Sequence, residues 1–315
     1  MTESPLPTFI HMSTKTLKIK PLVIAVVGPT SIGKSDYAVT LAKKIGGEII
    51  SADSRQVYRG LDIGSGKITK KEMDGIQHYM LDVASPKKVF SVHDFKKKAL
   101  PILLNIVARG KTPIIVGGTG FYVDALVGEN VIPEVPPNKK LRKKFLAQSA
   151  EVNFKHLQKL DPKRAKTIDK HNNVRLVRAI EIATALGSVP KQKKVALPYR
   201  VLWMGLTADR DILRKRIEKR LRARLLQGML GEVKKLRAEG VSWKRLHDLG
   251  LEYRYVALHL QGKLKIEDLE KTLADKIYQY AMRQLRWFKR NKEINWIDAK
   301  QMSKMAGPEV MKFLK

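Results

Sequence analysis

Short runs of apolar residues alternate with stretches of helical periodicity along most of this chain. Residues 21–28, PLVIAVVG, form a β-branched run between Pro and Gly, a pattern that predicts a buried strand. Residues 35–47, SDYAVTLAKKIGG, have helical spacing and end at two glycines. Further strands are predicted at 47–53, 112–118, 200–210 and 293–298, with long amphipathic helices up to about 290. This alternation predicts right-handed βαβ units, so we expect an α/β core with a parallel sheet flanked by helices.

The pattern changes near residue 129. ENVIPEVPPNKK contains three prolines and is typical of a linker, and a strongly basic helical stretch follows it. That stretch closes with a second connector rich in Pro and Lys, SVPKQKKVALPY. We therefore predict a flexible N-terminal extension at 1–20, a core domain from 21–128 and 198–315, and a helical insertion domain at 129–197. The chain shows no internal repeats.

Composition narrows the class of protein. The 315 residues are 43% hydrophobic, which is enough for a core and excludes disorder throughout. The sequence has no apolar run long enough for a transmembrane helix, and the first twenty residues lack the apolar region of a signal peptide. The absence of cysteine excludes disulfides, zinc fingers and thiol chemistry. These features lead us to expect a cytoplasmic protein that does not bind membranes.

The charge of the chain points to a polyanionic partner. Lys and Arg number 62 against 30 Asp and Glu, which leaves a formal net charge of +32. Such an excess favours nucleic acid first and an acidic membrane surface second. A lysine-rich genome or thermal adaptation is an alternative source of the same imbalance.

One segment carries the first specific chemistry. Residues 28–35, GPTSIGKS, fit the phosphate-binding pattern G-x-x-x-x-G-K-[ST] and stand between a predicted strand and a predicted helix. Backbone amides and the helix N-terminus can bind anionic oxygens, Lys34 adds a cation, and the Ser35 hydroxyl suits a Mg²⁺ ion. The predicted diphosphate site therefore consists of Gly28, Pro29, Thr30, Ser31, Ile32, Gly33, Lys34 and Ser35. The motif does not say which molecule carries the phosphates.

Asp53 stands at the end of the second predicted strand. A kinase could use it on magnesium or as a base, whereas a structural interpretation makes it the cap of a turn. The residues that follow are Ser54, Arg55 and Gln56. Together with Asp53 they offer donors and acceptors suited to reading the edge of a base.

Several segments together are far more specific than the phosphate loop. GPTSIGKS, ISADSRQVYRGLDIGSGK, VGGTGFYVDAL, VRLVRAIEI and MRQLRWFKR occur in this order. In these segments the chain resembles the tRNA dimethylallyltransferases, also called tRNA isopentenyltransferases, from about residue 22 to residue 298. Because cysteine is absent, the resemblance is to the bacterial form without a zinc finger.

The resemblance implies a reaction and several residue roles. The family transfers a dimethylallyl group from dimethylallyl diphosphate to N6 of adenosine 37, beside the anticodon of tRNA. It implies a P-loop NTPase-like core, Mg²⁺ as cofactor and a monomeric enzyme. Asp53 matches the family's general base, Thr119 a threonine on the diphosphate side, and Arg220 an arginine that clamps the diphosphate. On position alone, Thr119 could equally cap a loop and Arg220 could simply face solvent.

The resemblance also implies that the basic insertion grips the anticodon stem-loop. Asp53, Ser54, Arg55 and Gln56 are predicted to contact tRNA, as are Lys139, Lys140, Arg175 and Arg178. Other lysines and arginines of the insertion add to this surface: Arg142, Lys143, Lys144, Lys191, Lys193 and Lys194. For the arginine pair, ion pairing with Glu181 is the structural alternative. Arg55, Gln56 and residues 249–255 are candidates for lining the base pocket.

The sequence departs from the family pattern in a few places. DKHNN precedes the arginine pair where many relatives have His-Pro-Asn-Asp, residues 249–255 lack a Gly-Tyr pair, and Arg286 replaces a threonine. These departures affect details of tRNA contact rather than the diphosphate site. Trp287 and Phe288 are predicted to belong to the core.

Three other functions remain open at this stage. A small-molecule kinase or ATPase explains the phosphate loop but not the basic insertion. An adenylate isopentenyltransferase, acting on free nucleotides, shares the donor site and has little use for the charge. A nucleotide-gated RNA-binding module would have no need of Asp53.

Overall fold

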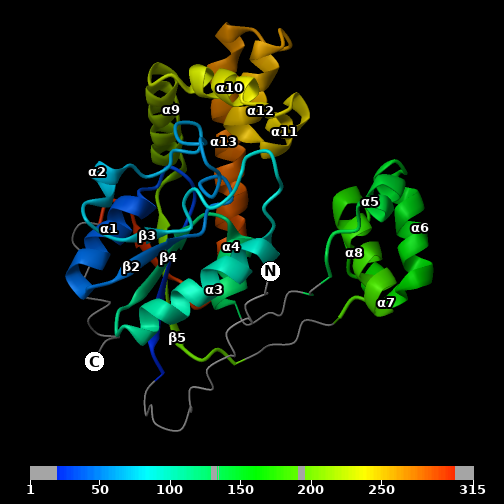
Figure 1. The fold of residues 1–315 in the computed structure, drawn as a ribbon, viewed down its shortest axis with the longest axis horizontal. Coiled ribbons are helices and arrows are strands. Elements are labelled where there is room, and N and C mark those ends of the chain that lie inside the picture. The colour runs from blue at the N-terminus through cyan, green and yellow to red at the C-terminus, as the bar shows by residue number, and fades with distance from the viewer. Residues whose placement is uncertain (1–19, 129–132, 134, 191–195, 302–315) are drawn as a thin grey trace, which may run out of the picture. The chain divides into compact units, whose positions relative to one another are not determined.

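The computed structural model describes residues 20–128, 133, 135–190 and 196–301. Over these residues, six parallel strands form one sheet in the order β3-β2-β4-β1-β5-β6 (Figure 1). The strands are β1 (Leu22–Val27), β2 (Glu48–Ser51), β3 (His78–Tyr79), β4 (Pro113–Gly117), β5 (Arg200–Thr207) and β6 (Asn295–Asp298). The parallel α/β fold and the five predicted strands are confirmed. Only β3 was not predicted, because two residues are too few to show a periodicity.

The order of the strands decides where the loops meet. All six residues of β1 are buried, as a continuous apolar run covered on both faces requires. β1 lies between β4 and β5, with Val27 opposite Gly117 and Gly205, and β4 also pairs with β2. Because the strands are parallel, the chain leaves β1, β4 and β2 at the same edge of the sheet.

The described chain divides into two compact units. Of the described residues, the first unit comprises 20–89, 98–123 and 197–301, and the second comprises 90–97, 124–128, 133, 135–190 and 196. The N-terminal extension predicted at 1–20 falls outside the described residues except for its last position. The insertion was predicted at 129–197, and the second unit starts earlier in the sequence than that linker.

Most helices belong to the first unit. Beside the sheet are α1 (Lys34–Ile45), α2 (Lys70–Met73), α3 (Val92–Ala108) and α4 (Gly120–Val127), of which α3 and α4 contribute residues to both units. After β5 come α9 (Arg210–Leu226), α10 (Met229–Ala238), α11 (Trp243–Leu249), α12 (Leu251–Leu260) and α13 (Ile266–Phe288). Figure 1 shows α9 and α13 side by side, with α10, α11 and α12 at their far end. Across the described ranges, no helix is both long and apolar enough to cross a bilayer.

Among the described residues of the second unit, four helices besides the parts of α3 and α4 share a core. They are α5 (Lys139–Leu146), α6 (Ala150–Leu160), α7 (Pro162–Ala165) and α8 (Asn173–Leu186). Phe145, Leu157, Leu176 and Ile180 are among the buried side chains that pack together. Each helix begins at a side chain that accepts a hydrogen bond from the backbone of its first turn, as a good N-cap does. These caps are Asn138, Ser149, Asp161 and Asn172.

Glu48 anchors the start of β2. The residue is 3% exposed, and its carboxylate accepts hydrogen bonds from Arg109 at 2.7 and 2.5 Å, from Lys111 at 2.7 Å and from the Tyr79 hydroxyl at 2.9 Å. The Arg109 hydrogen bonds are the main reason that the pKa of Glu48 falls to about 2. This cluster ties β2 to β3 and to the turn that enters β4.

Glu48→Gln should therefore weaken the dependence of stability on acid. Folded Glu48 titrates near 2 and an unfolded glutamate near 4.5, so the unfolded state binds more protons between these values. The stabilisation is complete above pH 4.5 and is lost as the pH falls towards 2. Urea unfolding at about pH 5.5 and about pH 3.5 should show a larger loss of free energy for the wild type than for Glu48→Gln. Equal losses would contradict this account of the cluster.

Candidate active site

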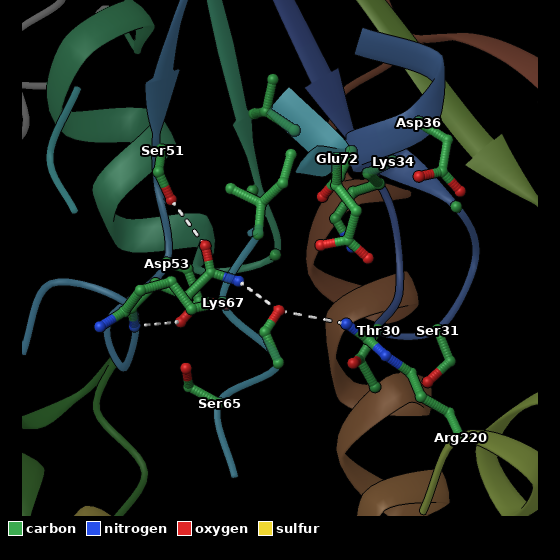
Figure 2. A pocket seen from close by; sticks show the side chains of 18 of the residues that line it. Thr30, Ser31, Lys34, Asp36, Ser51, Asp53, Ser65, Lys67, Glu72 and Arg220 are labelled. Carbon is green, nitrogen blue, oxygen red and sulfur yellow. Dashed lines mark hydrogen bonds between the residues drawn. The ribbon is translucent and has the colours of Figure 1, made fainter. Parts of the chain in front are cut away.

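A cavity of about 510 Å³ lies at the carboxyl ends of β1, β2 and β4 (Figure 2). The loop after β1, residues 62–72 and side chains of α9 and α13 complete its walls. Figure 2 shows Lys34, Asp53 and Arg220 around this space, although they come from three separate elements. Of the predicted site residues, the cavity is lined by Thr30, Ser31, Ile32, Gly33, Lys34, Ser35, Asp53, Gln56 and Arg220. The predicted residues outside its lining are Gly28, Pro29, Ser54, Arg55, Thr119 and those of the second unit.

The loop after β1 has the backbone conformation that its glycines predict. Gly28 has φ of 144°, and a Cβ there would lie 2.5 Å from the Leu206 carbonyl oxygen. Gly33 has φ of 99° and occupies the N-cap of α1. Both positions therefore favour glycine. The loop delivers the N-terminus of α1 to the cavity, where backbone N–H groups and the helix dipole favour an anion.

Lys34 contributes a cation whose charge depends on its surroundings. Its ammonium donates a hydrogen bond to the Pro29 carbonyl oxygen at 2.7 Å. Burial lowers the pKa of Lys34 to about 7, with Asp53 opposing and Arg220 adding to this shift. A bound anion beside the ammonium would raise this pKa again.

Asp53 follows β2 and uses one oxygen to shape the local turn. Its Oδ1 accepts hydrogen bonds from the backbone N–H groups of Arg55 at 2.7 Å and Gln56 at 3.3 Å. The structural interpretation of Asp53 as a turn cap is therefore confirmed for this oxygen. Within the described residues Oδ2 accepts no hydrogen bond, and the carboxylate lines the cavity. One oxygen thus holds the group in place while the other is available to a substrate.

Thr119 connects the loop after β4 to the turn after β2. Its Oγ1 accepts a hydrogen bond from the Ser54 N–H at 3.0 Å and donates one to the Ser54 hydroxyl at 3.3 Å. The Tyr280 hydroxyl interacts with the same side chain, and burial raises the pKa of Tyr280 to about 12. Thr119 therefore stands beside the Asp53 turn, and its contacts include the loop-capping role left open by the sequence.

Gln56 and Arg220 meet at one backbone carbonyl. Gln56 donates to the Gly66 oxygen at 3.2 Å and accepts from the Ser51 hydroxyl at 3.1 Å. Arg220 donates to the same Gly66 oxygen at 3.2 Å. Desolvation and then the neighbouring Arg224 lower the pKa of Arg220 to about 10. The Gln56 amide is thus hydrogen-bonded to other residues of the protein. Arg220 lines the cavity.

Comparison with known proteins supplies a family. The family model described as IPP transferase matches residues 56–291. This chain belongs to the IPP transferase family. It is 37% identical over 290 residues to a tRNA dimethylallyltransferase of Halalkalibacterium halodurans, covering 89% of this chain and 92% of that protein. It is 42% identical over 302 residues to tRNA dimethylallyltransferase 2 of Treponema denticola, covering 91% and 99%.

Solved structures agree with this assignment. The full-length tRNA isopentenylpyrophosphate transferase of Bacillus halodurans aligns with a TM-score of 0.70 and 34% identity, over 94% of this chain and 97% of that one. A eukaryotic dimethylallyltransferase, described in crystallographic snapshots as acting on tRNA, aligns with a TM-score of 0.79 and 25% identity. That match covers 93% of this chain and 78% of the eukaryotic one. The family resemblance and the fold predicted from the motifs are confirmed.

Gln284 is a buried residue of this family member for which the sequence suggested no role. It lies on α13 and is 6% exposed. Its Oε1 accepts a hydrogen bond from the Thr30 N–H at 2.8 Å, and its Nε2 donates to the Gly118 oxygen at 2.9 Å. The side chain therefore joins the phosphate loop to the loop after β4. Its only signal in the sequence was its place in MRQLRWFKR.

Glu232 holds the opposite wall of the cavity. Its carboxylate accepts hydrogen bonds from three successive backbone N–H groups, at residues 62, 63 and 64, at 2.9, 2.6 and 3.0 Å. The Tyr253 hydroxyl donates to it as well, at 2.9 Å. Beside it, the buried Glu252 pairs with Arg224 at 3.1 Å. These contacts fix the loop that carries Gly66, the acceptor for Gln56 and Arg220.

The same contacts show what residues 249–255 do beside this cavity. These residues were candidates for lining the base pocket, and none of them lines the cavity described above. Glu252 and Tyr253 are buried and support the loop at 62–66 from behind.

In the second unit, the two arginines of the predicted pair differ. Arg178 forms an ion pair with Glu181 and donates to the Val135 oxygen at 2.9 Å, which confirms the structural alternative for this residue. Glu181 also accepts from Arg142 at 2.9 and 2.8 Å. Arg175, Lys139 and Lys140 are exposed. Lys191, Lys193 and Lys194 lie outside the described residues.

Among the residues that line the cavity, Ser35 offers an oxygen ligand for Mg²⁺. Within the described residues, no group of three or more His, Cys, Asp or Glu side chains is arranged to hold a metal ion. Ser35 does line the cavity at the start of α1, and its hydroxyl is a hard oxygen donor. Mg²⁺ in phosphate sites commonly takes one or two protein ligands and completes its shell with phosphate oxygens and water. The Ser35 hydroxyl therefore fits as one protein ligand of a Mg²⁺ ion whose remaining ligands are phosphate oxygens and water.

Lys34 provides a pH-dependent test of the diphosphate site. Because its pKa is about 7, Lys34 is largely neutral at about pH 8 and should take up a proton when an anion binds. An arginine stays charged, so Lys34→Arg should bind without that proton. Calorimetry of inorganic pyrophosphate in buffers of different ionisation enthalpy should show nearly one extra proton taken up by the wild type. At about pH 6 the difference in proton uptake between the wild type and Lys34→Arg should be smaller. If the two proteins took up the same number of protons at both pH values, the assignment would be contradicted.

Proposed function

We propose that this chain transfers a dimethylallyl group from dimethylallyl diphosphate to N6 of adenosine 37 in tRNA and releases diphosphate. The relatives named as tRNA dimethylallyltransferases support the reaction, and the eukaryotic structure described as acting on tRNA supports the acceptor. The observation that carries the proposal is the position of Asp53. Its carboxylate has one oxygen without a hydrogen bond among the described residues, and Asp53 lines the same cavity as the phosphate loop.

Asp53 accounts for the acceptor half of the reaction. An exocyclic amine is a weak nucleophile, and a carboxylate that accepts its proton as the new bond forms assists the attack. The bond from N6 to C1 of the dimethylallyl group forms while the bond from C1 to the diphosphate oxygen breaks. The amine proton passes to Asp53 and the electron pair of the broken bond leaves with diphosphate. The two backbone N–H groups on Oδ1 hold the carboxylate in place for this transfer.

The phosphate loop accounts for the leaving group. Negative charge grows on diphosphate as the C–O bond breaks, and groups already fixed around it stabilise that charge. The backbone amides of residues 31–34, the Lys34 ammonium and the Arg220 guanidinium belong to residues that line the cavity and suit this role. The Thr30 N–H is already bonded to Gln284. Ser35 would hold a Mg²⁺ ion, which supplies further neutralisation of the diphosphate when it is bound.

The second unit accounts for affinity towards tRNA. Exposed cations such as Lys139, Lys140 and Arg175 suit contacts with backbone phosphates, which add affinity without reading the sequence. Arg142 and Arg178 are already paired with the buried Glu181 and contribute mainly to the helix packing of this unit. The excess of 62 basic over 30 acidic residues favours a polyanionic acceptor over a free nucleotide.

A transfer assay tests the proposal directly. The protein is incubated with unmodified tRNA, labelled dimethylallyl diphosphate and Mg²⁺, and the tRNA is then digested to nucleosides. We expect the label in N6-isopentenyladenosine. Label on AMP or ADP alone would indicate an adenylate isopentenyltransferase, and release of ADP from ATP would indicate a kinase. Either outcome would contradict the proposal.

Asp53→Asn should separate chemistry from binding. The amide keeps the size of the side chain but cannot accept the proton, so the maximal rate should fall by about 10²–10⁴-fold. Affinities for tRNA and for pyrophosphate should stay near those of the wild type, measured by filter binding and calorimetry. Asp62→Asn is a matched control, because Asp62 also lines the cavity but is paired with Lys67. A loss of binding as large as the loss of rate would argue against Asp53 as the base.

A further inference from the structure

Two aromatic rings lie next to the loop after β4, which carries Thr119, on the surface of the first unit. Phe121 is 57% exposed, and its ring centroid lies 4.5 Å from that of Trp287 at an interplanar angle of 54°. The Arg290 guanidinium lies over the Trp287 ring, 3.9 Å from its centroid. The exposed Phe121 ring, the Trp287 ring and the Arg290 guanidinium therefore form one contiguous cluster. The prediction that Phe288 belongs to the core is confirmed, whereas Trp287 is only partly buried.

The cluster is attached rigidly to the residues of the site. Phe121 follows Thr119 by two positions, so their Cα atoms lie within about 7 Å. A Cβ at the intervening Gly120 would lie 2.2 Å from Nε1 of Trp287, so the indole packs directly on this backbone. Thr119 in turn contacts Ser54, the neighbour of Asp53. The exposed ring is therefore connected through Thr119 and Ser54 to the turn that carries the proposed proton acceptor.

The chemistry of the cluster fits an unpaired base. Bases in single-stranded RNA stack on aromatic rings and on arginine planes, and such stacking tolerates different bases. Arg290 adds a cation, and across the described residues it forms no ion pair with a carboxylate. A target adenine can enter the cavity only if it leaves the stack of its loop, which also exposes the base beside it.

We propose that Phe121, supported by Trp287 and Arg290, stacks on the base adjacent to the target adenosine in the anticodon loop. This inference rests on the proposed function for its acceptor RNA. These three side chains form a stacking platform. The platform holds the anticodon loop open while the target base occupies the cavity. The platform reads no base edge, so it should favour any base over none.

A binding experiment with a missing base tests the contact. Affinity is measured for an anticodon stem-loop RNA and for two versions that are abasic at the nucleotide on the 5′ or the 3′ side of the target. With the wild type, one abasic version should bind about ten-fold more weakly, in line with the loss of a stacked base. With Phe121→Leu, the intact RNA should bind about ten-fold more weakly, and that abasic change should cause little further loss.

Three controls keep the result interpretable. Phe121→Tyr retains the ring and should bind like the wild type, whereas Leu226→Ala changes another exposed apolar side chain, 89% exposed, and should have no effect. Unchanged pyrophosphate affinity and thermal midpoint show that Phe121→Leu folds. Independent losses from Phe121→Leu and from both abasic changes would overturn the platform. Because binding is measured without donor, failure of the transfer reaction would leave this test intact and would count against the proposed function alone.

Discussion

The site depends on the adjacency of three parallel strands. β2 pairs with β4 and β4 pairs with β1, so the chain leaves all three at one edge of the sheet. The phosphate loop follows β1, Asp53 follows β2, and Thr119 follows β4. A diphosphate and a proton acceptor can therefore share one cavity without either loop being long. The burial of β1 on both faces fixes this arrangement, because its apolar residues have no other place in the fold.

The helices after β5 close the cavity around that edge. α9 supplies Arg220, and α13 supplies Gln284, which is bonded to both the phosphate loop and the loop after β4. A Cβ at Gly118 would lie 2.1 Å from the Gln284 amide, so the glycines of this loop permit the helix to pack against it. Glu232 holds the remaining wall by three backbone N–H groups. The phosphate loop, the loop after β4 and residues 62–64 are thus held in place by hydrogen bonds to the side chains of Gln284 and Glu232.

The sequence predicted those features of the fold and the site that depend on residues close together in the chain. The β-branched runs predicted five strands, and the phosphate loop was predicted from its motif between a strand and a helix. Asp53 was singled out by its position at the end of a strand, and its role as a base was implied by the family resemblance. Gln284 and Glu232 escaped prediction because their partners lie 254, 166 and about 170 positions away. Arg220 entered through family resemblance, since a helix of alternating Arg and Lys does not show which cation faces a cavity. The same limit made Arg175 and Arg178 indistinguishable until Glu181 was seen to pair with Arg178.

The central claim is that the phosphate loop stabilises a departing diphosphate, so the bond broken lies on the carbon side of the bridging oxygen. The direct measurement uses dimethylallyl diphosphate that carries ¹⁸O at the oxygen joining C1 to phosphorus, together with tRNA and Mg²⁺. Mass spectrometry of the products should find the isotope wholly in the released diphosphate, with the dimethylallyl group on adenosine N6. Isotope retained on the carbon fragment would mean that a P–O bond is broken. That result would contradict the account and place the chain among phosphoryl-transfer enzymes.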